Sequence, residues 1–92
     1  MNVIESLFTR TSKCKLYIHT PTAAISERVQ KVLFTLGYCW EQNTRRPMLL
    51  NKPYVVVYRD DTQLLINDLY DENAYLVESN TFLRNNILKK LH

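Results

Sequence analysis

The sequence predicts an α+β protein, in which one long amphipathic helix packs on a mainly antiparallel sheet of four or five strands and a second helix closes the chain. Three observations lead to this class: an amphipathic stretch at Thr20–Trp40, a run of branched and aromatic residues at 53–59, and polar turn residues between the other apolar segments. The chain has 92 residues, of which 46% are hydrophobic. This length supports one modest core, so we expect residues 1–92 to form a single domain.

The stretch Thr20–Trp40 is expected to form the helix around which the fold is built. Its apolar residues recur at helical spacing and define one stripe, which consists of Ile25, Val29, Val32, Leu33 and Leu36. Thr20 or Thr22 can cap the first turn, and Gly37 suits the left-handed residue that ends many helices. After Gly37, the aromatic-rich residues 38–40 fit a strand better than a continued helix.

The strands are predicted from alternation and from side-chain type. Residues 14–19 alternate, which places Leu16 on the core face and Tyr17 on the opposite face of a half-buried strand. Residues 53–59 form the strongest predicted strand, and the polar turn that follows leads to a returning strand at 63–67.

The remaining segments carry weaker signals. Residues 1–12 are expected to be an arm or a short helix, and residues 48–50 a short edge strand. Residues 74–77 fit a short strand or a helical turn. Ser79 is a suitable N-cap for a closing helix at 81–91, because Leu83, Ile87 and Leu91 are spaced by four residues.

The charges are distributed unevenly along the chain. Residues 1–59 contain nine lysines and arginines against three glutamates, whereas residues 60–92 contain three basic and six acidic residues. A polyanion-binding face would produce such an asymmetry, and so would an ordinary solvated surface. We expect phosphate contacts from six side chains: Lys13, Lys15, Arg45, Arg46, Lys52 and Arg59. Tyr17 is expected to stack on a base.

Catalytic and metal-binding patterns are weak in this sequence. The single glycine excludes a glycine-rich phosphate loop. The spacing of Cys14, His19, Cys39 and His92 matches no common zinc motif, so we expect no metal or cofactor and two buried free thiols. His19 is the one candidate acid or base at a strand end, which leaves a small metal-independent ribonuclease as a third interpretation.

Phe34 does not follow the helical stripe. It lies on the opposite side of the predicted helix from Ile25, among polar residues. A large apolar side chain in this position indicates a homodimer contact or a partner surface, unless a terminal segment folds over it.

The strand, the helix ending in Leu-Gly-Tyr-Cys-Trp and the following hairpin, over Lys15–Asn67, resemble a pattern found in small accessory proteins of large tailed phages. The resemblance implies a host-takeover or counter-defence factor that acts by binding RNA or a host toxin. We therefore expect a non-enzymatic, homodimeric RNA-binding protein that interferes with a host defence or toxin system. The alternative is a protein-binding inhibitor of a host protein, with an apolar surface that includes Phe34.

The location expected from the sequence is the cytoplasm, which is the host cytoplasm for a phage-encoded protein. No apolar run reaches the length of about 18 residues that a membrane helix needs, and the N-terminus carries no cleavable signal pattern.

Overall fold

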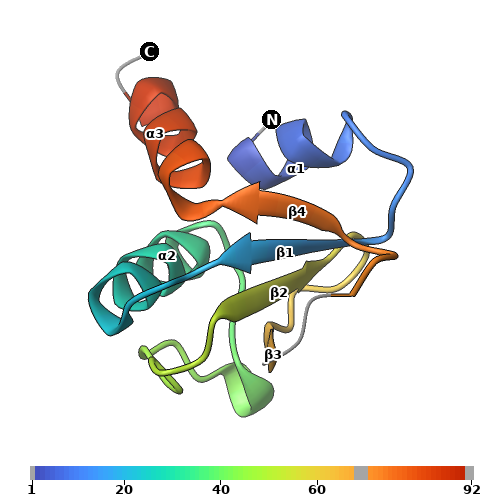
Figure 1. The fold of residues 1–92 in the computed structure, drawn as a ribbon. Coiled ribbons are helices and arrows are strands. Elements are labelled where there is room, and N and C mark those ends of the chain that lie inside the picture. Colours follow the sequence, from blue (N-terminus) through green and yellow to red (C-terminus); the bar gives the residue numbers. More distant parts are fainter. Residues whose placement is uncertain (1, 68–70, 91–92) are drawn as a thin grey trace.

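The computed structural model describes residues 2–67 and 71–90 and confirms the α+β class (Figure 1). The elements in chain order are α1 (Val3–Phe8), β1 (Lys15–His19), α2 (Ala23–Thr35), the 3-10 helix η1 (Glu41–Asn43), β2 (Tyr54–Tyr58), β3 (Leu65–Asn67), β4 (Tyr75–Glu78) and α3 (Ser79–Lys90). The predicted closing helix thus begins two residues earlier than expected, and its last residue, Leu91, lies outside the described residues.

The strands form one sheet in the order β3-β2-β1-β4. β1 pairs antiparallel with β2, so that Lys15 lies opposite Tyr58 and His19 lies opposite Tyr54. β2 also pairs antiparallel with β3, but β4 joins β1 in parallel. The sheet is therefore mixed, because the chain crosses from the β3 edge to the β4 edge. The predicted edge strand at 48–50 is instead part of a loop.

The limits of α2 follow from its caps. Thr22 is the N-cap, and its Oγ1 accepts a hydrogen bond from the Ile25 amide at 3.2 Å. At the other end, Gly37 has φ of +100°, and the Tyr38 amide donates to the Leu33 carbonyl at 3.0 Å. The helix is 13 residues long, which is shorter than the predicted long helix. The expected strand at 38–40 is absent from the described fold, where Cys39 makes only an isolated bridge to Gln63.

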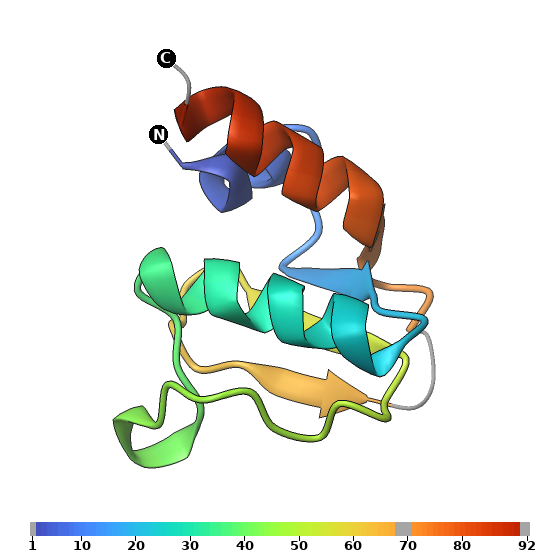
Figure 2. The ribbon, with the colours of Figure 1, turned by 90° about the vertical axis from the view of Figure 1, so that its left-hand side faces the viewer.

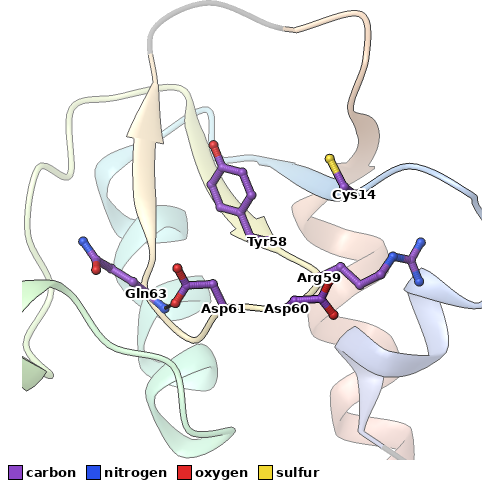
Figure 3. Close-up of a pocket in the computed structure, with 6 residues that line it drawn as sticks. All are labelled: Cys14, Tyr58, Arg59, Asp60, Asp61 and Gln63. Atoms are coloured by element: carbon purple, nitrogen blue, oxygen red, sulfur yellow. Dashed lines mark hydrogen bonds between the residues drawn. The ribbon is translucent and has the colours of Figure 1, made fainter.

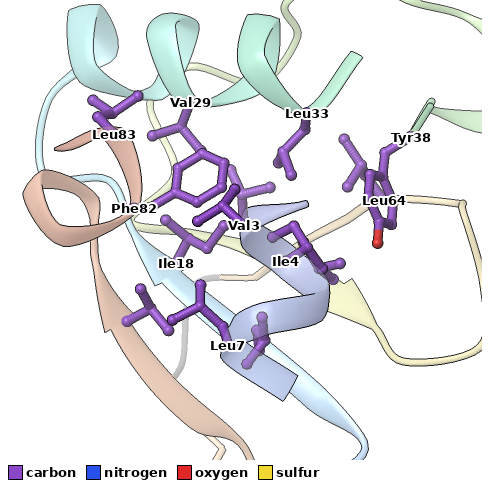
Figure 4. Close-up of a cluster of buried hydrophobic side chains, with 14 of the residues drawn as sticks. Val3, Ile4, Leu7, Ile18, Val29, Leu33, Tyr38, Leu64, Phe82 and Leu83 are labelled. Carbon is purple, nitrogen blue, oxygen red and sulfur yellow. The ribbon is translucent and has the colours of Figure 1, made fainter. Parts of the chain in front are cut away.

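All three α-helices contribute to one core on the same face of the sheet. α3 contacts both α1 and α2, and Figures 1 and 2 show α1 and α3 near each other beside the sheet. In Figure 4, Phe82 of α3 lies between Val29 of α2 and Ile18 of β1. The short helix α1 contributes Val3 and Ile4, which are 1% and 0% exposed. The N-terminal segment is therefore part of the core and not an arm on a partner.

The buried side of α2 differs from the predicted stripe. Ser26 and Gln30 are completely buried together with Val29 and Leu33, whereas Ile25, Val32 and Leu36 are only partly buried. Phe34 is also partly buried and packs against the core, so the expected isolation of this side chain on a polar face is wrong. The reason is that α2 has neighbours on more than one side, namely the core beneath it and the loop at 44–52.

The opposite face of the sheet carries a second, smaller cluster. Tyr17, Val56 and Ala74 are 3%, 0% and 2% exposed, and Tyr54 and Tyr58 pack against them. The ring centroids of Tyr17 and Tyr54 are 5.6 Å apart. Because Ala74 precedes β4, the segment that leads into this strand covers part of this sheet face. Both faces of the central strand are therefore buried at Val55–Val57.

Candidate functional site

The basic side chains at the start of β1 have acidic or carbonyl partners. Lys15 forms an ion pair with Asp71, and Lys13 Nζ donates a hydrogen bond to the Glu72 carbonyl at 2.9 Å. The hydrogen bond from Lys15, followed by the one from the Asn73 amide, lowers the pKa of Asp71. The same hydrogen bond raises the pKa of Lys15. The acidic C-terminal third thus neutralises Lys15 and supplies a carbonyl partner to Lys13.

Arg59 holds the connection between α1 and β1. Its guanidinium donates to the carbonyls of Phe8 at 3.3 Å, Thr11 at 2.8 Å and Lys13 at 2.6 Å. It also lies 4.6 Å from the centroid of the Phe8 ring, within the range of a cation–π contact. The Arg59 guanidinium therefore contacts three backbone carbonyls and one aromatic ring, which gives Arg59 a structural role.

The other predicted residues lie elsewhere. Lys52 lies at the opposite end of the strands from Lys15, since Thr20 after β1 donates to the Lys52 carbonyl at 3.0 Å. Arg45 and Arg46 are exposed in the loop between η1 and β2. Tyr17 is buried, so it does not present a ring for base stacking. The fold therefore places Lys15 and Lys52 at opposite ends of the strands and buries the ring that was expected to stack on a base.

His19 has an acidic neighbour that the sequence did not reveal. Its Nδ1 lies 3.1 Å from Glu78 Oε2, and its ring lies 5.4 Å from that of Tyr54. The pairing follows from the parallel register, which sets His19 opposite Glu78. Within the described residues, no group of three His, Cys, Asp or Glu side chains is arranged to hold a metal ion.

A hollow of about 400 Å³ lies at the turn between β2 and β3, lined by Cys14, Tyr58, Arg59, Asp60, Asp61 and Gln63. Figure 3 shows that its polar groups do not converge, since the Arg59 guanidinium points towards α1 and away from Asp61. Cys14 is exposed, contrary to the expected buried thiol, because β1 begins one residue later; Cys39 is buried as expected.

A second hollow, of about 330 Å³, has a more apolar lining and is termed the Leu49 hollow. It is lined by Trp40, Glu41, Thr44, Met48, Leu49, Gln63 and Leu64. Met48 and Leu49 are 37% and 53% exposed, and Leu76 is the third exposed large hydrophobic residue in the described part of the chain. Two exposed apolar side chains beside an apolar hollow form a surface that another protein can cover.

Gln30 fixes the loop that carries these side chains. Its amide nitrogen donates to the Met48 carbonyl at 2.8 Å and to Ser26 Oγ at 3.0 Å. Its amide oxygen accepts from the Met48 amide at 2.9 Å and from Trp40 Nε1 at 3.3 Å. One buried side chain therefore binds both backbone groups of Met48 and joins the loop to the wall of the hollow.

The backbone around the Leu49 hollow is also defined on its other side. The Cys39 amide donates to the Thr62 carbonyl at 3.0 Å, and the Leu64 amide donates to the Cys39 carbonyl at 2.8 Å. Leu49 has φ of +52°, which is a left-handed conformation that a leucine rarely adopts. A strained residue with an exposed apolar side chain is a feature of binding sites more than of ordinary loops.

None of the residues that define the Leu49 hollow was predicted as a site residue. The sequence offered one signal, the run Met48-Leu49-Leu50 inside an otherwise polar connection. The run predicts an edge strand, whereas the structure has a loop there, and a short apolar run fits either one.

Comparison with protein-family models, curated proteins and solved structures gives no significant match. Within the described residues, none of the helices is both long enough and apolar enough to cross a membrane. The class defined by the fold and the site is thus a small α+β protein with an apolar surface hollow on a fixed loop.

Proposed function

We propose that this protein is a non-enzymatic binding module that docks a partner protein on the Leu49 hollow. The observation that carries the proposal is the exposure of Met48 and Leu49 beside an apolar hollow on a loop that a buried side chain holds in place. This is the alternative expected from the sequence, with the contact surface moved from Phe34 to Leu49. A host toxin or defence protein is the kind of partner that the phage resemblance suggests.

The loop is suited to binding because its shape is set before the partner arrives. Gln30 supplies hydrogen bonds to both backbone groups of Met48, so little loop entropy remains to be lost on association. The left-handed backbone of Leu49 supports the same interpretation. A loop selected only for stability would place asparagine or glycine there, since these residues adopt that conformation more easily.

The arrangement favours a protein partner over RNA. Of the seven side chains expected to contact RNA, Lys15 and Arg59 have strong partners within the fold and Tyr17 is buried. Recognition of single-stranded RNA depends on exposed aromatic or guanidinium planes next to a basic groove. Burial of Tyr17 and the internal partners of Lys15 and Arg59 leave fewer such groups for RNA than the sequence predicts.

The test is selection of a randomised peptide library, displayed on phage, against the purified protein and against a Leu49→Asn variant. Asparagine tolerates the left-handed backbone, so we expect the variant to fold with equal or slightly greater stability, by up to about 1 kcal/mol. We expect peptides selected on the natural chain to lose at least tenfold in affinity for the variant, or roughly 1.4 kcal/mol, as loss of a central apolar contact should cause.

The matched control is Leu76→Asn, which makes the same change at the other exposed leucine. This variant should retain peptide binding, because Leu76 lies on β4 and does not line the hollow. Failure to enrich any peptide, or equal losses in the two variants, would contradict the proposed function.

A further inference from the structure

We infer that the segment docked in the Leu49 hollow is acidic, with one large apolar side chain entering the hollow and carboxylates on either side of it contacting Arg45 and Arg46. The inference rests on the proposed function and specifies the chemistry of the partner. It combines the size of the hollow, the charge of the loop and the type of side chain that the loop exposes.

The volume of the Leu49 hollow limits the size of the group that can enter it. Pockets for small molecules span about 300–1,000 Å³, and this hollow, at about 330 Å³, lies at the lower end. It fits one large side chain and not a folded-over segment. Trp40 and Leu64 are 8% and 1% exposed, so they form its apolar walls, and Met48 can adjust to different shapes because its side chain is unbranched.

The loop that carries Met48 and Leu49 has a positive net charge. The segment 41–52 contains three cations, Arg45, Arg46 and Lys52, against one carboxylate, Glu41. Arg45 and Arg46 directly follow Thr44, which lines the hollow, and both are exposed. Among the described residues, the ion pairs join Lys15 to Asp71, His19 to Glu78 and Lys31 to Glu27, so neither arginine is neutralised in this way.

The same loop argues against a nucleic acid as the occupant. The segment 41–52 contains no aromatic residue, and Trp40 is 8% exposed, so its ring is not presented as a stacking platform. The exposed residues next to the arginines are instead aliphatic, Met48 and Leu49. Two exposed arginines in the loop beside an aliphatic hollow complement an acidic segment with an apolar anchor, because guanidinium groups pair with carboxylates in a bidentate manner.

The experiment uses the same randomised peptide library, with the sequences of the enriched peptides as the first readout. We expect an excess of Asp and Glu over Lys and Arg around a conserved Leu, Met, Phe or Trp. The second readout is the affinity of a synthetic enriched peptide, followed by the emission of Trp40, which is the only tryptophan in the chain.

Charge reversal separates the claim that the docked segment is acidic from the claim that the Leu49 hollow is a docking surface. We expect Arg45→Glu with Arg46→Glu to weaken the peptide by roughly tenfold, and the loss to shrink at high salt. The control is Arg10→Glu with Arg84→Glu, which makes the same charge change at two exposed arginines that do not belong to the loop. This control should leave the affinity within about twofold.

Each outcome has a distinct meaning. Enriched peptides without acidic excess, or equal effects of the two double variants, would overturn the inference while leaving the proposed docking surface intact. Absence of enrichment would overturn both. Binding of a labelled single-stranded RNA that survives Leu49→Asn and is lost on reversal of Arg45 and Arg46 would assign the arginines to a nucleic acid and would likewise overturn the inference.

Discussion

Replacing Gln30 with methionine tests the most distinctive contact of the fold. Gln30 is completely buried, and its amide makes four hydrogen bonds, two with Met48 and one each with Ser26 and Trp40. Methionine has a similar length and no branch, so Gln30→Met removes the polar atoms with little change in shape.

The expected loss of stability can be worked out from these bonds. At a net value of about 1 kcal/mol each, four bonds give an upper figure of ~4 kcal/mol. The Met48 backbone groups can regain water because Met48 is 37% exposed, whereas Trp40 Nε1 loses its partner in a buried position. We therefore expect the free energy of unfolding to fall by about 2–3 kcal/mol, and the melting temperature by roughly 10–20 °C.

Urea denaturation followed by circular dichroism gives this difference directly. The control is Lys31→Met, which makes a similar change at the next residue, where the exposed pair with Glu27 contributes about 0.5 kcal/mol or less. If Gln30→Met unfolds within about 0.5 kcal/mol of the natural chain, the loop is not held by this side chain. Binding of selected peptides should fall in the same variant, because the loop would lose its fixed shape.

Three further changes test the rest of the fold. The pKa of Asp71 is lowered, so its pair with Lys15 stabilises the fold above pH ~4 and loses this effect as the pH falls through the folded pKa. The difference in free energy of unfolding between Asp71→Asn and the natural chain should therefore vanish in acid. Gly37→Ala should cost about 1–2 kcal/mol through its φ of +100° alone, since an added Cβ meets no atom within 4 Å; thermal melting measures this loss. Arg59→Met should cost about 1–3 kcal/mol in urea denaturation, and an unchanged midpoint would contradict its role in holding the α1–β1 connection.

The sequence predicted those parts of the fold that local signals control. Thr22 and Gly37 act on their own neighbours, through a hydroxyl cap and a left-handed residue, so both were among the expected capping residues even though α2 is shorter than the predicted helix. The alternation at 14–19 similarly placed Leu16 in the main core and Tyr17 on the other sheet face. The parallel pairing of β4 was not predictable, because it depends on a crossover between distant edges.

The candidate site was missed because burial of a polar residue depends on tertiary partners. A hydrophobic pattern counts Gln30 as polar, yet Met48 and Trp40 satisfy its amide and allow complete burial. The partner of Lys15 was not predictable for a related reason. Lys15 and Asp71 are far apart in sequence, and only the register of β4 brings them together.

The most direct test of the central claim is a map of amide chemical shifts in the isotope-labelled protein on addition of a selected peptide. We predict that the largest changes occur in the backbone at 40–49 and at Gln63 and Leu64, which surround the Leu49 hollow. Changes centred on the sheet face of Tyr17 or on the start of β1 would contradict the assignment of this hollow as the functional surface.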